Sequence, residues 1–136
     1  MRTQNPKALL KAAAAAAKNA HCPYSMFRVG VALLASDGQV FPGCNVENAS
    51  YGLTVCAERN ALAAAVAQGI RKFKALAMVS DGEKPAPPCG ACLQVMAEFC
   101  APDFPIYAAT RHRPAIPVRW RLADLLPTAF RMDKNR

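Results

Sequence analysis

The sequence lacks the long apolar runs and the leader that would indicate a membrane or secreted protein. No uninterrupted apolar run approaches the ~20 residues that span a bilayer. The start, Met1 to Lys7, has neither the apolar core nor the cleavage site of a secretory signal, so we expect a cytoplasmic protein with no membrane contact. Histidine is scarce too, and neither His21 nor His112 stands in ligand spacing to the cysteines. Any metal site would therefore depend on thiolates.

Charged residues are also few, at 19%, whereas hydrophobic residues make up 53% of the 136 positions. This balance is typical of a folded chain, and the length suits a single domain, residues 1–136. The 17 basic and 9 acidic residues leave a net charge of +8, and the basic excess is strongest from Arg111 onward. A basic surface permits nucleic-acid contact. No stripe of alternating basic and aromatic residues accompanies it, so we expect no nucleic-acid partner.

Helices and strands alternate along the chain. A proline followed by a run of alanines favours a first helix, and Asp37-Gly38 is typical of a hairpin turn. The predicted helices are Pro6–Ala20, Val55–Gln68 and Cys89–Cys100, with a last helical turn at Leu122–Leu126. The predicted strands are Phe27–Ser36, Gln39–Cys44, Phe73–Ser80, Pro105–Thr110 and Ile116–Trp120. This order predicts an α/β fold with a mixed sheet flanked by helices, and it leaves residues 45–53 as a polar loop suited to binding.

Two short motifs contain the candidate chemistry: Cys56-Ala57-Glu58-Arg59 and Pro88-Cys89-Gly90-Ala91-Cys92. Both lie at predicted helix starts, where the helix dipole favours thiolates. We expect Cys56, Cys89 and Cys92 to bind one zinc ion and to leave a fourth position open for water. We expect Glu58, which is not a ligand, to carry protons. The combination C-x-E and P-C-x-x-C is similar to the signature of zinc deaminases.

Other interpretations of these residues remain open. A closed structural zinc site needs a fourth ligand, which one of three further cysteines would have to supply. Those three are otherwise expected to be small buried side chains and not disulfide partners: Cys22, Cys44 and Cys100. A thioredoxin-like redox pair would leave Cys56 and Glu58 without a role. Arg59 is expected to hydrogen-bond the thiolate sulfurs and offset their excess negative charge, and the alternative is a solvated helix arginine.

Further segments complete a resemblance to the homotetrameric cytidine deaminases. They are Cys22-Pro23-Tyr24-Ser25, Phe27, Val29-Gly30, Gly43-Cys44-Asn45-Val46-Glu47-Asn48-Ala49-Ser50-Tyr51, and Leu122-Ala123-Asp124-Leu125-Leu126-Pro127 with Phe130. With the two cysteine motifs they cover most of the chain, in the family's order. The resemblance implies a three-layer α/β/α fold around a five-stranded mixed sheet. It also implies zinc-dependent hydrolytic deamination of cytidine and deoxycytidine to uridine and deoxyuridine, in pyrimidine salvage.

The resemblance supports the zinc and proton-carrier roles above and adds six substrate positions. It implies that Asn45 and Glu47 hydrogen-bond the ribose hydroxyls and that Phe27 packs against the pyrimidine. The positions through which a neighbouring subunit of the homotetramer would close the pocket are Ala49, Tyr51 and Phe130. From the residues alone, Asn45 is equally a turn residue that holds its own backbone, and Phe27 and Phe130 are equally core residues.

The resemblance leaves the substrate open in two respects. A deaminase of N4-substituted cytidine or of a blasticidin-like analogue would use the same chemistry, and a nucleic-acid editing module would exploit the positive charge. The chain also departs from the family at one position, because the residue after the last zinc cysteine is commonly arginine there and is Leu93 here. A second positive charge near the thiolates is then missing.

Overall fold

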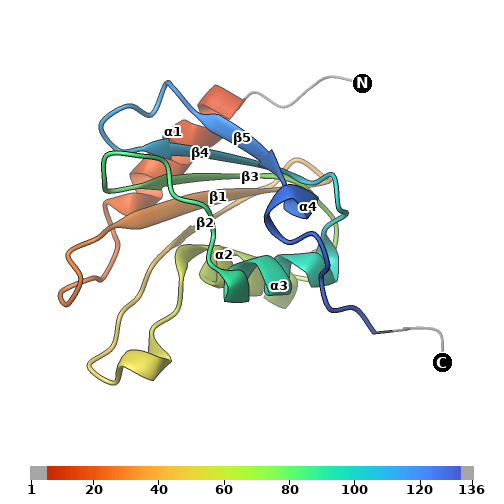
Figure 1. Cartoon of the computed structure of the whole chain (residues 1–136), viewed down its shortest axis with the longest axis horizontal. Coiled ribbons are helices and arrows are strands. Elements are labelled where there is room, and N and C mark those ends of the chain that lie inside the picture. Colours follow the sequence, from red (N-terminus) through yellow and green to blue (C-terminus); the bar gives the residue numbers. More distant parts are fainter. Residues whose placement is uncertain (1–5, 133–136) are drawn as a thin grey trace.

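The computed structural model describes residues 6–132, and its centre is a five-stranded sheet with helices on both faces (Figure 1). The end of the basic C-terminal segment, residues 133–136, lies outside the described residues. The strands are β1 (Val29–Ala35), β2 (Val40–Cys44), β3 (Phe73–Ser80), β4 (Pro105–Thr110) and β5 (Val118–Arg121). The helices are α1 (Pro6–Ala17), α2 (Ala57–Ala67), α3 (Gly90–Phe99) and α4 (Leu122–Leu125), with a 3₁₀ turn, η1 (Tyr51–Leu53).

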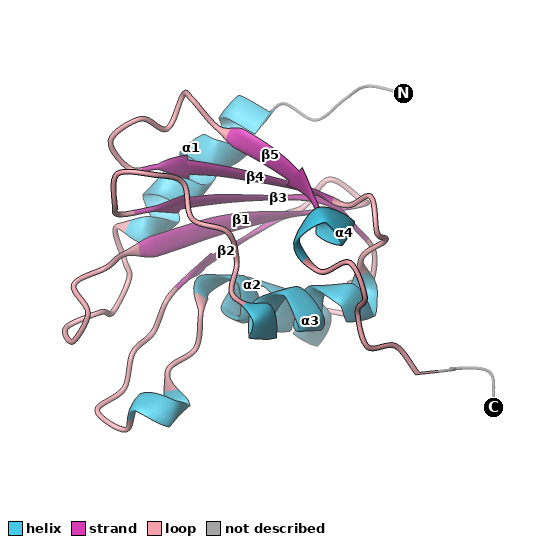
Figure 2. Cartoon of the chain, viewed as in Figure 1, coloured by secondary structure: helices cyan, strands magenta, loops and turns pink. Residues whose placement is uncertain are grey.

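The sheet is mixed, as predicted. Its strand order is β2-β1-β3-β4-β5, and every neighbouring pair is antiparallel except β3 and β4. Parallel strands need a crossover connection, which α3 provides between β3 and β4. Residues 81–89 lead from the end of the central strand β3 to the start of α3 (Figure 2).

Two cores separate the molecule into three layers. Alternate side chains of β3 point to opposite faces, so that Ala75, Ala77 and Val79 pack with α1, whereas Leu76 and Met78 pack with α2 and α3. Figure 1 shows α1 on one face of the sheet and α2 and α3 on the other. The predicted α/β/α sandwich is confirmed.

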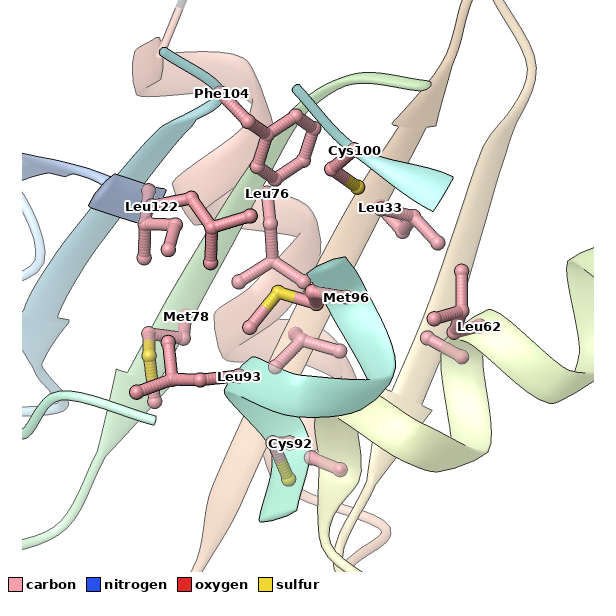
Figure 3. Close-up of a cluster of buried hydrophobic side chains, with 14 of the residues drawn as sticks. Leu33, Leu62, Leu76, Met78, Cys92, Leu93, Met96, Cys100, Phe104 and Leu122 are labelled. Carbon is pink, nitrogen blue, oxygen red and sulfur yellow. The ribbon is translucent and has the colours of Figure 1, made fainter. Parts of the chain in front are cut away.

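The core beneath α3 explains the leucine that follows the last cysteine motif. Leu93 is only 5% exposed and packs in the same cluster as Met78 and Met96 (Figure 3). Cys92 lies at one end of this cluster and is fully buried. Position 93 is thus an apolar core position in this chain.

The predicted elements are all present, but several of their ends are wrong. The first helix ends at Ala17 and not at Ala20, because the chain turns at residues 18–19. The second and third helices begin after Cys56 and Cys89, whose backbones are extended. The first strand begins at Val29, which leaves Phe27 outside the sheet. The η1 turn in the polar loop was not predicted. Within residues 6–132, every helix is too short or too polar to traverse a bilayer.

Candidate metal centre and active site

Three cysteine sulfurs converge where α2 and α3 begin. Cys56 and Cys89 are the residues directly before the two helices, and Cys92 lies in the first turn of α3. The three sulfur atoms lie within 4.8 Å of one another, with Sγ–Sγ distances of 3.8 Å between Cys56 and Cys89 and 3.6 Å between Cys89 and Cys92. Sulfurs bound to one tetrahedral zinc at ~2.3 Å stand about 3.8 Å apart. The cluster therefore fits a zinc ion.

The number of protein ligands distinguishes a closed structural zinc site from a catalytic one. Among residues 6–132, no other histidine, cysteine or carboxylate joins the three sulfurs within that distance. The remaining cysteines are free and lie outside the cluster. Cys22 and Cys100 are buried, as predicted, whereas Cys44 is only partly buried, so its predicted burial is wrong. Three protein ligands are typical of a catalytic zinc, whose fourth position receives water or substrate.

Electrostatics favours ionisation of at least one of these thiols. Hydrogen bonds from Cys92, Arg59 and Cys89 lower the pKa of Cys56 to about 5. The Nη2 atom of Arg59 donates to the Cys56 sulfur across 3.5 Å. The predicted contact of Arg59 with a thiolate is therefore present, and the solvated alternative is not. Because Leu93 offers no donor, Arg59 is the one arginine among the described residues that hydrogen-bonds this cluster.

Glu58 lies in the first turn of α2, two residues after Cys56, and only 4% of it is exposed. Burial raises the pKa of its carboxyl to about 7. A carboxyl with a pKa near neutrality both accepts and releases a proton at physiological pH, which is what a proton carrier requires. Glu58 lines the same cavity as Cys56 and Cys89, so a molecule bound there lies within reach of all three.

The cavity has a volume of about 420 Å³ and unites most of the predicted site. Its wall includes the predicted residues Phe27, Asn45, Glu47, Cys56, Glu58 and Cys89. Sequence reasoning missed Ser25, Val29, Thr54, Ala57, Met78, Ala86 and Pro87. The last two belong to the segment between β3 and α3, for which the sequence offered no role. Their position directly before the Pro88-Cys89 motif was the signal that would have found them.

The Asn45 side chain hydrogen-bonds backbone groups. The expectation that it holds its own backbone is wrong, because its partners belong to a distant segment of the chain. Its side-chain oxygen accepts from the Val29 N–H at 2.9 Å, and its amide nitrogen donates to the Phe27 carbonyl at 2.8 Å. It is buried, with 9% exposed. Asn45 therefore fixes the chain on both sides of Arg28 and so sets where the Phe27 ring enters the cavity.

Glu47 is held by the segment opposite it. One carboxylate oxygen accepts from the backbone N–H groups of Tyr24 and Ser25, at 3.0 and 3.1 Å, and the other accepts from the Ser25 hydroxyl. These hydrogen bonds, that of the hydroxyl first, keep the pKa of Glu47 below its ordinary value. Glu47 is thus an ionised acceptor in a fixed position at the cavity wall.

The three residues predicted to act on a neighbouring subunit do not line this cavity. Ala49 is exposed, Tyr51 is 74% exposed and Phe130 is 70% exposed. Tyr51 lines a second hollow of about 370 Å³ that shares Ser25, Glu47 and Thr54 with the first. The interpretation of Phe27 and Phe130 as core residues is wrong, because Phe27 lines the cavity and the Phe130 ring lies in solvent.

Comparison with known proteins is consistent with this geometry. The model of the cytidine and deoxycytidylate deaminase zinc-binding region matches residues 3–108. A cytidine deaminase of Sporosarcina psychrophila is 52% identical over 115 residues, which are 85% of this chain and 83% of that protein. A cytidine deaminase of Halalkalibacterium halodurans is 49% identical over 122 residues, 90% of this chain and 91% of that one. The crystal structure of a cytidine deaminase from Burkholderia pseudomallei superposes with a TM-score of 0.88 at 47% identity, over 93% of this chain and all of that one.

Proposed function

This chain belongs to the cytidine and deoxycytidylate deaminase family, and from that membership we propose that it hydrolyses cytidine and deoxycytidine to uridine and deoxyuridine. In this reaction water supplies the new oxygen at C4 of the pyrimidine, and the amino group leaves as ammonia. The observation that carries the proposal is a buried carboxyl, Glu58, in one cavity with two of three converging cysteine sulfurs.

Each group at the centre has a distinct part. Cys56, Cys89 and Cys92 would hold zinc, which when bound lowers the pKa of water to near neutrality and so supplies the nucleophile. Glu58 takes a proton from that water and donates it to N3 of the pyrimidine. It then takes the proton of the new hydroxyl group at C4 and delivers it to the amino group, which departs as ammonia as the C4 carbonyl forms. Arg59, through its contact with the Cys56 sulfur, offsets the excess negative charge of three thiolates.

The cavity walls would orient the nucleoside. The Phe27 ring would pack against the pyrimidine face. Glu47 is ionised and can accept hydrogen bonds from ribose hydroxyls. Asn45 gives one amide hydrogen and one oxygen lone pair to the backbone, and it retains one further hydrogen and one further lone pair for the sugar. Both side chains would thus hold the ribose so that the pyrimidine lies beside Glu58.

We also propose that the active protein is a homotetramer acting in cytoplasmic pyrimidine salvage. Ala49, Tyr51 and Phe130 are exposed and lie outside their own chain's main cavity. Tyr51 and Phe130 are large side chains in solvent, and together with Ala49 they would close the pocket of a neighbouring copy.

The experiment is the loss of cytosine absorbance when zinc-assayed protein is mixed with cytidine or deoxycytidine. Wild-type protein should convert both. Glu58→Gln should retain zinc and lose at least about 100-fold in kcat, because proton transfer by a positioned side chain contributes 10²–10⁴-fold. Glu83→Gln, which alters an exposed glutamate of the β3–α3 segment, is the matched control and should retain activity.

Two results would overturn the proposal. Zinc-loaded wild type that converts neither nucleoside, but converts an N4-substituted cytidine or a blasticidin-like analogue, would replace the substrate and keep the chemistry. Full activity of Glu58→Gln would remove Glu58 from the reaction.

A further inference from the structure

The C-terminal segment (residues 127–132) is attached to α3 by a glutamine that has no other assigned role. The Gln94 side-chain nitrogen donates to the Phe130 carbonyl at 2.8 Å, and its oxygen accepts from the Phe130 N–H at 3.2 Å. One amide thus satisfies both backbone groups of one residue. Such a two-point contact fixes the position and the rotation of the Phe130 backbone together.

A second contact fixes the same segment one residue further along. Arg131 Nη1 donates to the carbonyl of Ala97 at 2.6 Å. Ala97 is among the last residues of α3, whose carbonyl groups lack helical partners. A cation at this end also interacts favourably with the helix dipole. The segment is therefore held by two side chains, Gln94 of α3 and Arg131 of the segment itself.

The backbone of Phe130 is held in place, but its side chain is exposed. The Phe130 ring is 70% exposed, and it contributes neither to the core nor to the main cavity of its own chain. A phenylalanine that served only to anchor the segment would be buried. Here the backbone is fixed while the ring stays in solvent, which is the arrangement of a preorganised contact for another molecule.

We propose that Gln94 is a positioning residue, which holds the Phe130 backbone so that its ring is presented to the nucleoside pocket of a second copy of this chain. The inference rests on the proposed function. Gln94 lies two residues after Cys92 on α3, so the helix that would carry one zinc ligand of one pocket, directly after another, also fixes the ring that closes a second pocket. Gln94 acts only through Phe130 and does not touch the substrate.

The test is a double-mutant cycle with cytidine. Gln94→Met keeps the length of the side chain and removes both hydrogen bonds, and we expect KM to rise about 10-fold, with a smaller change in kcat. Phe130→Ala should raise KM further. The double variant should match Phe130→Ala alone, because Gln94 has no effect once the ring is gone. Gln68→Met, at the exposed end of α2, is the control and should behave as wild type.

Four measurements separate this role from a purely structural one. Zinc content and oligomer mass should be unchanged in Gln94→Met, whereas hydrogen exchange of the 127–132 segment should accelerate. Arg131→Met, which loosens the segment at its other contact, should raise KM in the same direction. An unchanged KM in Gln94→Met, or effects of Gln94→Met and Phe130→Ala that multiply, would overturn the inference. Inactive zinc-loaded wild type would instead overturn the proposed function itself.

Discussion

Gly43 of β2 lies so close to Ala57 that a methyl group on its Cα would stand 2.5 Å from the Ala57 carbonyl oxygen. The same methyl group would stand 2.8 Å from the Ala61 side chain, one turn along α2. Ala57 separates Cys56 from Glu58. The absence of a side chain at Gly43 therefore sets how closely the first turn of α2, with a zinc ligand before it and the proton carrier within it, approaches the sheet.

Gly43→Ala should move the start of α2 away from the sheet. Overpacking of a well-packed contact costs about 1–3 kcal/mol, so we expect the free energy of unfolding to fall by that amount in urea titrations followed by Trp120 fluorescence. We also expect weaker zinc binding, because Cys56 would move relative to Cys89. A competition titration with a chromophoric chelator measures this.

The comparison variant is Gly30→Ala, which overpacks the opposite face. A methyl group there would stand 2.2 Å from the Ala13 carbonyl oxygen of α1, on the face of the sheet opposite α2 and α3. It should destabilise the protein while the folded fraction binds zinc as wild type does. Equal losses of zinc affinity in the two variants would contradict a specific role of Gly43 at the centre.

Arg59→Met tests the one guanidinium of residues 6–132 that hydrogen-bonds the cluster. Loss of a group that supports metal ligands lowers affinity or activity by about 10–100-fold, and we expect that decrease in zinc affinity, together with a lower kcat. Arg59→Lys should recover part of the loss, because it restores the charge without the planar donor geometry. Arg119→Met, on the edge strand β5, provides the control, and an Arg59→Met protein with wild-type zinc affinity would exclude the electrostatic role.

Local signals in the sequence predicted much of this site. The Cys56 and Cys89 motifs were predicted to lie at helix starts from the local sequence, without knowledge of the tertiary structure. A helix N-terminus places adjacent side chains at one end of the element. The strand Phe73–Ser80 was also predicted to the residue, because the consecutive apolar residues 75–79 at its centre are typical of a buried strand.

What escaped prediction depends on contacts between distant segments. The side chain of Asn45 holds the Phe27 and Val29 backbone, and Gln94 holds Phe130 across 36 positions. Neither pairing has a periodic or local signature. The burial of Leu93 likewise follows from how α3 packs on the sheet, which residue spacing alone does not give.

Asp81 should make the stability depend on pH. Burial raises the pKa of its carboxyl, but the hydrogen bonds from the Arg28 N–H at 2.8 Å and the Arg111 guanidinium at 3.0 Å overcome this and hold the pKa below its ordinary value. A carboxyl with a depressed folded-state pKa stabilises the fold above its unfolded-state pKa, about 3.9. That contribution is lost as the pH falls from there through the folded-state pKa.

Asp81→Asn should therefore unfold more readily than wild type at pH 6 in urea, and the difference should shrink below about pH 4. Zinc release in acid affects both proteins and cancels in the comparison. Arg111→Met should reduce the same difference, because it removes one of the two partners. A gap between wild type and Asp81→Asn that stays constant from pH 6 to pH 3 would contradict this assignment.

Subunit complementation tests whether Phe130 acts on a second copy. Glu58→Ala should be inactive, and Phe130→Ala should be impaired in substrate binding. In a mixed oligomer, an intact Glu58 of one chain can meet an intact Phe130 of another. If chains assort at random into closed symmetric oligomers, about one pocket in four combines both intact residues.

Coexpressed chains should then regain cytidine deamination at low substrate concentration, where neither parent is effective. Purified parents mixed without subunit exchange serve as the control. Recovery that does not exceed the sum of the parents would place Phe130 on its own chain's pocket, or outside the reaction, since a ring acting within one chain cannot be supplied by a partner.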